Sequence, residues 1–178
     1  MSKKKLAMAT IVIAIILDQV IKIYVKTHFV LGEEVVFFDW FRIHFVENNG
    51  MAMGFEFGGK AGKLFLTVFR LVAVSAIIYW LMGAIKSKVH NAVIVAISLI
   101  FSGAVGNIID SVFYGVIFDT SNHKVATLFA DKSYGDLFYG KVVDMFYFPL
   151  WQGVLPEWIP FIGGEFFTFF QYIFNPAD

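Results

Sequence analysis

The sequence predicts an all-α integral membrane bundle that carries a small β-sheet at one face. Of the 178 residues, 58% are hydrophobic and 16% are charged, and the mean hydropathy is +0.72. Soluble domains are about half apolar and about a quarter charged, and a chain this short has too little interior to bury the excess. Three long apolar stretches and one short alternating stretch divide the chain into expected helices and sheet.

The apolar stretches cover about 6–25, 64–85 and 91–110. Each is long enough to cross a bilayer as a helix, which takes about 20 residues. A further apolar stretch predicts the start of a fourth helix within about 166–178. The first stretch follows three lysines as an export signal does, but it runs on through Asp18 without the small residues of a cleavage site. We therefore expect it to stay in the protein.

Lysines predict the orientation of these helices. Residues 3–5 are all lysine and precede the first helix, while Lys86 and Lys88 lie in the short link between the second and third. Cytoplasmic loops carry an excess of lysine and arginine. We therefore expect the N-terminus and this link in the cytoplasm, and the segments 27–63 and 111–165 at the outer face.

Each outer segment has its own pattern. Residues 42–45 alternate polar and apolar, as a half-buried strand does, and Asn48-Asn49-Gly50 is a turn signal, so we expect a β-cradle over about 33–58. The second segment opens with a polar insertion over about 111–140 and then becomes rich in aromatic residues, which favour the membrane interface. We find no internal repeat and expect residues 1–178 to form a single membrane domain.

Charge and residue usage argue against several classes of function. The net charge is zero, whereas binding to nucleic acid needs a basic face. The absence of cysteine removes disulfides, thiolate zinc sites and cysteine nucleophiles. The four histidines form no HExxH pair, which disfavours a zinc protease. We expect neither a metal ion nor another cofactor.

Charged residues inside the apolar stretches need a partner or a function. Asp18 lies about 20 Å along the first helix from the last cytoplasmic lysine, where a carboxylate costs about 2.5–3.5 kcal/mol. Lys22 comes four residues later, on the same helix face. The two can form an internal ion pair, with Lys22 and Lys26 snorkelling outward, or anchor an active site, and these two interpretations are compatible. Arg70, in the second helix, is expected to snorkel or to pair with an acid.

Small and polar residues share one face at the end of the third helix. Gly103, Asn107 and Asp110 fall within about 60° of one another on a helix, which suits either helix packing or a site. Asp144 and Asp178 lie in apolar, interfacial surroundings. They are either solvated loop acids or a pair that shares one proton, with one member activating a water and the other protonating a substrate oxygen.

Five motifs resemble those of lipoprotein signal peptidases (signal peptidase II). They are Asp18-Gln19-Val20-Ile21-Lys22, Glu47-Asn48-Asn49-Gly50-Met51-Ala52-Met53-Gly54, Gly103-Ala104-Val105-Gly106-Asn107-Ile108-Ile109-Asp110, Val142-Val143-Asp144-Met145 and Phe174-Asn175-Pro176-Ala177-Asp178. Each motif is weak alone, but five in family order across the whole chain form a specific signal.

The resemblance implies four transmembrane helices with an outer-face β-cradle and interfacial elements, in the bacterial cytoplasmic (inner) membrane. It implies an aspartyl endopeptidase that cuts diacylglyceryl-modified prolipoproteins just before the lipidated cysteine. Asp144 and Asp178 would form the catalytic dyad. The residues that would bind substrate or orient the dyad are Asp18, Lys22, Asn48, Gly50, Gly103, Asn107, Asp110 and Asn175. The implied partners are the lipidated prolipoprotein, membrane lipid and a cyclic peptide inhibitor of the globomycin kind.

Three departures from the family pattern bear on these expectations. Ser111 stands where the family usually has arginine, so we expect Arg70 to serve the polar cluster instead, by pairing with Asp110 or an adjacent group. The stretch from Ser111 to Asp144 is longer than in compact members. Asp178 is the last residue of the sequence, where the family's fourth helix begins, so that helix is expected to be missing or truncated and activity to depend on it.

Two other functions stay open at this point. One is a non-enzymatic membrane protein, such as a transporter subunit or an assembly factor, whose buried acids serve ions or helix pairing. It predicts that Asp144 and Asp178 do not converge. The other is a degenerate peptidase that binds lipidated peptide without cutting it.

Overall fold

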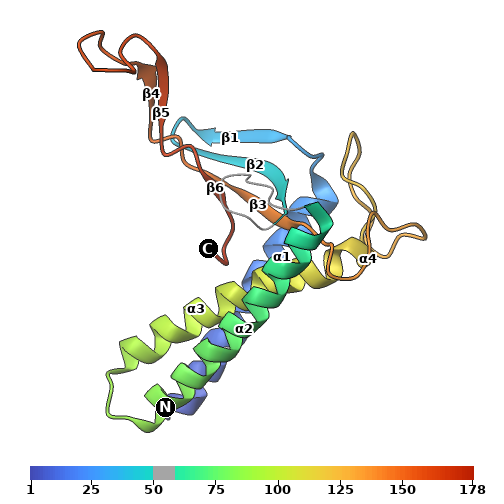
Figure 1. Ribbon diagram of the computed structural model, residues 1–178, viewed down its shortest axis with the longest axis vertical. Helices are drawn as coiled ribbons and strands as arrows, with labels where there is room; N and C mark the ends of the chain where they lie inside the picture. The colour runs from blue at the N-terminus through green and yellow to red at the C-terminus, as the bar shows by residue number, and fades with distance from the viewer. Residues whose placement is uncertain (50–58) are drawn as a thin grey trace.

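Three long helices form the body of the protein, and the sheets lie at the end of the helices opposite the N-terminus (Figure 1). The computed structural model describes residues 1–49 and 59–178. The helices are α1 (Lys3–His28), α2 (Gly59–Lys86) and α3 (Asn91–Ile109), and α3 contacts both of the others. A π-helical turn, η2 (Asp110–Tyr114), and the short α4 (Gly115–Ile117) prolong α3. Three helical segments in the described part of the chain are long and apolar enough to span a membrane, namely Lys3–His28, Ala61–Lys86 and Asn91–Ile117. The prediction of three apolar helices is confirmed.

Local signals explain where the helices begin. The side chain of Ser2 accepts a hydrogen bond from the Lys5 amide at 3.4 Å, which caps the start of α1. The side chain of His90 does the same for α3 through the Ala92 amide. Many large apolar side chains on the helices, such as Ile13, Phe69 and Ile100, are exposed on the protein surface, which is the pattern that lipid contact favours.

Strands from distant parts of the chain build the larger sheet. Its antiparallel order is β1-β2-β3-β6, where β1 is Glu34–Phe38, β2 is Phe41–Asn48, β3 is Val142–Tyr147 and β6 is Ile173–Phe174. The expected strand at 42–45 lies inside β2. The cradle expected at about 33–58 therefore takes half of its strands from beyond residue 140, while its residues 50–58 lie outside the described residues.

A second hairpin projects from the far end of this sheet (Figure 1). It consists of β4 (Trp151–Val154) and β5 (Phe166–Phe169), paired from Trp151↔Phe169 to Val154↔Phe166. The expected start of a fourth helix within about 166–178 is wrong, because this stretch holds β5 and β6. Aromatic residues and threonine fit a pleated, partly exposed surface well, and β4 offers β5 a complete pairing edge.

The insertion expected over about 111–140 begins as helix. The third helical segment runs on to Ile117, beyond the predicted limit near residue 110. The polypeptide then forms turns and bends, held by an antiparallel bridge between Phe118 and Leu128. A hydrophobic core joins the end of α1 to this region and to the sheet, with Val25, Phe45, Tyr114, Phe118, Ala126, Val143 and Met145 buried in it.

Candidate active site

Lys22 is the centre of a buried ion cluster between α1 and α3. Its Nζ lies 3.1 Å from Asp18 Oδ2 and 2.8 Å from Asp110 Oδ2, and it donates to Asn107 Oδ1 at 2.9 Å. The Lys22 side chain has no exposed surface. The expected internal ion pair of Asp18 with Lys22 is therefore present. The expected outward snorkelling of Lys22 and Lys26 is wrong, since both side chains are fully buried. A buried ammonium without a partner would be strongly destabilising, and the carboxylates of Asp18 and Asp110 supply the partners of Lys22.

Gln19 completes this cluster and was not predicted as a site residue. Its Nε2 donates to Asp18 Oδ2 at 3.0 Å and to Asp110 Oδ1 at 3.0 Å, and it also reaches the Gly106 carbonyl at 3.3 Å. Tyr114 donates to Gln19 Oε1 at 3.1 Å. Gln19 could have been predicted as a site residue, because it is polar and lies within an apolar helix. Its neutral amide is a weaker indication than the charges of Asp18 and Lys22.

Asp110 connects the ion cluster to the sheet, because its Oδ2 also accepts a hydrogen bond from the Val143 amide at 3.4 Å. The next residue, Asp144, lies in β3 and is buried. Its Oδ1 accepts from Asn175 Nδ2 at 2.5 Å, and its Oδ2 accepts from the side chain of Asn48 at the end of β2. Burial raises the pKa of the Asp144 carboxyl to about 6, and the nearby Asp178 carboxylate adds to the rise, against the donors from Asn175 and Asn48.

Asp178 lies beside Asp144 and is more exposed. Its Oδ1 accepts a hydrogen bond from the side-chain Nδ2 of Asn107 at 2.9 Å, and its Oδ2 accepts one from the backbone amide of Asn175 at 3.3 Å. Asn175 Nδ2 also donates to Asn107 Oδ1 at 3.1 Å. Asn107 and Asn175 therefore connect the two acids. Asp144 and Asp178 converge, as the resemblance implied, whereas the non-enzymatic alternative predicted that they would not. This arrangement can place a water between a buried acid and an exposed one.

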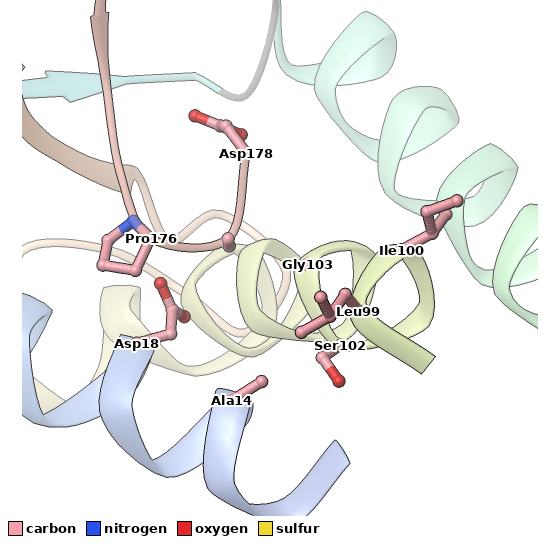
Figure 2. Close-up of a pocket in the computed structure, with 9 residues that line it drawn as sticks. Ala14, Asp18, Leu99, Ile100, Ser102, Gly103, Pro176 and Asp178 are labelled. Atoms are coloured by element: carbon pink, nitrogen blue, oxygen red, sulfur yellow. The ribbon is translucent and has the colours of Figure 1, made fainter. Parts of the chain in front are cut away.

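Glycines let the 175–178 segment approach α3. A Cβ at Gly103 would lie 1.9 Å from the Ala177 carbonyl oxygen, and a Cβ at Gly106 would lie 3.3 Å from the Ala177 Cβ. A Cβ at Gly106 would also lie 2.4 Å from Asp18 Oδ2 on α1, so this glycine admits the ion cluster as well. Below the segment is a pocket of about 250 Å³, lined by Ala14, Asp18, Leu99, Ile100, Ser102, Gly103, Pro176, Ala177 and Asp178. Figure 2 shows Asp18 and Pro176 close together at this pocket, with the Asp178 carboxyl pointing away from them. The small residues of the third motif thus admit the segment that carries Asp178.

Arg70 reaches the cluster from α2. Its Nη1 donates to Ser111 Oγ at 3.4 Å, and Ser111 Oγ donates to the Asn107 carbonyl at 2.8 Å. Asp178, Asp110 and Asp144 all attract its charge. Of the two expected partners, Asp110 or an adjacent group, the described contact is with an adjacent group, at the position where the family usually has arginine.

A second buried ion pair supports the end of β2. Lys26 contacts Glu47 Oε1 and donates to Ser121 Oγ at 3.0 Å, and Lys141 Nζ lies 3.5 Å from Glu47 Oε2. Burial opposes the charge on Glu47, yet the Lys26 ammonium outweighs it and lowers the pKa of the Glu47 carboxyl. The pair connects α1, β2 and the 119–141 segment one residue away from Asn48. This pair was not predicted from the sequence, because its two charges lie on different elements.

Nine of the ten predicted site residues meet in this one region. They are Asp18, Lys22, Asn48, Gly103, Asn107, Asp110, Asp144, Asn175 and Asp178. The tenth, Gly50, lies outside the described residues. Gln19, Gly106 and Tyr114 belong to the region as well. Within residues 1–49 and 59–178, no group of three or more histidine, aspartate or glutamate residues is placed to hold a metal ion.

Comparisons with known proteins give matches over nearly the whole chain. The family model described as signal peptidase (SPase) II matches residues 10–178. A lipoprotein signal peptidase of Porphyromonas gingivalis is 52% identical over 176 residues, which cover 98% of this chain and 76% of the relative. A lipoprotein signal peptidase of Amoebophilus asiaticus is 36% identical over 170 residues, covering 93% of this chain and 68% of the relative.

Solved structures share the fold. Two bacterial membrane enzyme structures determined by the in meso method, at 2.3 Å and 1.9 Å resolution, superpose with TM-scores of 0.58 and 0.57. Both alignments cover 97% of this chain, and they cover 77% and 82% of the solved chains. The identities are 23% and 24%, so this likeness concerns the fold.

Proposed function

Because this chain belongs to the signal peptidase II family of membrane aspartyl proteases, we propose that Asp144 and Asp178 are its catalytic pair. The enzyme removes signal peptides from prolipoproteins, as lipoprotein signal peptidases do. The observation that carries the assignment of the pair is the connection of its two carboxyls through Asn175 and Asn107.

The environments of the two acids suggest different roles. Burial raises the pKa of Asp144 to about 6, so this carboxyl takes up a proton more readily than an ordinary aspartate does. We assign Asp144 the role of acid, which donates a hydrogen bond to the carbonyl oxygen of the scissile peptide bond. Asp178 is exposed, and we assign it the role of base, which takes a proton from the attacking water.

The reaction then needs only water and the two carboxyls. The water oxygen adds to the carbonyl carbon, the C–N bond breaks, and a proton passes to the leaving nitrogen. The products are a signal peptide with a new carboxylate and a lipoprotein with a free amino group on its cysteine. We propose that the cysteine already carries diacylglycerol, so that its acyl chains lie in the same membrane that the helices span.

The buried ion cluster holds this pair in place. Lys22 binds Asn107, which binds Asp178, while Asp110 binds the backbone of β3 next to Asp144. In this proposal the positioning residues are Asp18, Lys22, Asn48, Asn107, Asp110 and Asn175. Arg70 donates to Ser111 behind Asn107, and we assign it the supporting place that arginine usually has in the family.

We further propose that the pair lies at the outer face of the bacterial inner membrane, with the N-terminus in the cytoplasm. The lysines near both the N-terminus and the α2–α3 link support this orientation. A cyclic peptide of the globomycin kind is expected to compete with the substrate at the same pair.

A direct assay tests the substrate assignment. The enzyme in proteoliposomes is given one prolipoprotein in two forms, with and without diacylglycerol on the cysteine, and mass spectrometry identifies the new termini. We expect cleavage of the lipidated form alone, just before the cysteine. Equal cleavage of both forms, or cleavage elsewhere, would contradict the proposed specificity.

A further inference from the structure

The β4–β5 hairpin presents aromatic side chains that the rest of the protein leaves uncovered. Trp158 is 80% exposed and Phe161 is fully exposed at its tip, and Val154 and Phe166 are also exposed on its strands. Residues 149–172 contain Glu157 and Glu165 but no lysine or arginine. The hairpin surface is therefore apolar and weakly acidic, with no attraction for anionic groups.

The tip is a built structure that holds these side chains outward. The Leu155 amide donates to the Glu165 carbonyl at 3.0 Å, the Gly164 amide to the Leu155 carbonyl at 2.9 Å, and the Gly163 amide to the Ile159 carbonyl at 3.0 Å. Phe161 has a φ of 70°, in the left-handed region that a side chain of this size rarely adopts. Strain of this kind persists only where surrounding structure imposes it, and here the result is an outward aromatic ring.

Aromatic rings in stacked and edge-to-face contact connect the hairpin to the larger sheet. Ring centroids lie 6.2 Å apart between Trp40 and Phe148, 5.6 Å between Phe148 and Phe174, and 6.1 Å between Phe174 and Phe170. The aromatic surface thus runs from the β1–β2 turn to the base of the hairpin. Figure 1 shows the hairpin leaning to one side of the helices, so that it runs obliquely to their axes instead of extending them.

We propose that the β4–β5 hairpin is a lipid-contacting arm, whose tip inserts Trp158 and Phe161 into the headgroup boundary of the leaflet at the sheet end of the helices. The occupant is lipid because the helices of the same chain keep a bilayer within reach of the hairpin, and the aromatic surface is continuous with the sheet that adjoins that bilayer. Tryptophan and tyrosine favour this boundary. The lack of lysine and arginine means that insertion of apolar rings, rather than attraction to anionic headgroups, holds the arm.

The arm also connects the two candidate catalytic segments. β3 carries Asp144 and leads into β4, and β5 leads into β6 and Asp178. Lipid contact at the tip therefore restrains the segment between the two acids. This inference concerns the position of the arm and does not depend on the cleavage that we propose.

Spin labelling of the whole protein tests the position of the tip. The sequence has no cysteine, so Phe161→Cys and Phe129→Cys each give one labelling site. Phe129 is a matched control, because it is also an exposed loop phenylalanine with positive φ but lies in the polar 119–136 segment. In phosphatidylcholine nanodiscs, oxygen concentrates in the bilayer and a nickel chelate stays in water. We expect the label at 161 to collide more often with oxygen than with the chelate, and the label at 129 to show the opposite preference.

Three outcomes are distinguishable. Preference for oxygen at 161 alone supports the arm. Equal access of the nickel chelate to both labels places the tip in water and overturns the proposal. Spin–spin broadening at 161 in discs that hold two copies would place the tip between copies of this chain, which also overturns it.

A second measurement keeps the native tip. A variant with Trp40, Trp80 and Trp151 changed to Phe leaves Trp158 as the single tryptophan of the four. Brominated phosphatidylcholine should quench its fluorescence by at least about half, with little quenching by aqueous acrylamide. The reverse order of quenching would refute lipid contact even if the labelled variants failed to fold.

Discussion

The side-chain amide of Asn107 donates a hydrogen bond to Oδ1 of Asp178 across 2.9 Å. Its own oxygen accepts from Lys22 at 2.9 Å and from Asn175 at 3.1 Å. These contacts allow one orientation of the amide, because a flip would point its NH₂ group at the Lys22 ammonium. A single side chain therefore transmits the position of the buried ion cluster to one of the two candidate catalytic acids.

Asp144→Asn and Asp178→Asn should each abolish cleavage of a lipidated prolipoprotein, with a loss on the order of 10²–10⁴-fold or more. The amide keeps the size and polarity of the side chain but cannot exchange the proton. A gel-shift assay of the substrate measures the loss, and circular dichroism checks the fold. Asp131→Asn is the matched control, since Asp131 is an exposed acid outside the cluster. Normal turnover by either variant of the pair would remove it from the mechanism.

The pKa of Asp144 predicts a pH dependence of stability. Burial raises this pKa from 3.8 to about 6, so the folded state binds more protons than the unfolded state between these values. Stability should therefore fall as the pH rises from about 4 to about 6, by up to about 3 kcal/mol relative to Asp144→Asn. Thermal unfolding in detergent at pH 4, 5, 6 and 7 measures the difference between the two proteins.

The companion variant for this test is Asp178→Asn. Removing the neighbouring carboxylate should lower the pKa of Asp144 and so narrow the pH window. The effect of Asp144→Asn on the pH dependence of stability is then measured with Asp178 present and with Asp178→Asn. An identical effect in both backgrounds would show that the two acids do not interact.

Lys22→Met should destabilise the protein by about 3–5 kcal/mol, because it leaves the carboxylates of Asp18 and Asp110 buried without their shared cation. Adding Asp110→Asn should restore part of the loss. The exposed Lys88→Met is the control and should change little. Thermal unfolding provides the measurement, and an unchanged transition for Lys22→Met would mean that the ion cluster adds no stability.

Gly103→Ala should reduce cleavage strongly while the helices stay folded. The new Cβ would lie 1.9 Å from the Ala177 carbonyl oxygen, so the 175–178 segment must move away from α3 and take Asp178 with it. Gly83→Ala is the matched control, since a Cβ there meets nothing within 4 Å. We expect the control to keep its activity and to gain up to about 1 kcal/mol from helix propensity. Equal activity of the two variants would contradict the role of Gly103.

The proposed orientation predicts opposite labelling at the two ends of the helices. Ser87 is exposed in the α2–α3 link, and Asn122 is exposed near the sheet end, whereas the neighbouring Ser121 is buried and unsuitable. Ser87→Cys should be protected from an impermeant thiol reagent added outside intact cells, and Asn122→Cys should react. Labelling of Ser87→Cys from outside would reverse the topology.

Part of the site could be predicted from the sequence pattern, because polar residues in apolar runs need partners. Asp18, Lys22 and Asp110 stand out for that reason, and they meet in the structure. Their roles, and those of Asp144 and Asp178, came from the resemblance, since a lone acid near an interface has no distinctive pattern.

Other parts could not be predicted from local patterns. The sheet pairs β2 with β3, and the register of Val46 with Asp144 joins residues about a hundred positions apart. The run Phe166-Phe167-Thr168-Phe169 is apolar on both a helical and a strand period, and only its pairing with β4 decides between them. The buried partner of Lys26 is Glu47, which lies on a different element. The sequence of the first helix therefore showed no partner for Lys26, and snorkelling was the remaining expectation.

The spread of the site along the chain also governs when it can first work. Roughly 160 residues separate Asp18 from Asp178, and a ribosome adding about 5–20 residues per second needs roughly 10–30 s to make that stretch. Asp110 leaves the ribosome well before Asp178, so the ion cluster can assemble while the second acid is still unmade. During insertion into the bilayer, the nascent protein therefore passes through an interval in which the proposed catalytic pair is incomplete. Under the proposed mechanism, a half-made chain thus lacks the acid pair with which to cut the lipoproteins that share its membrane.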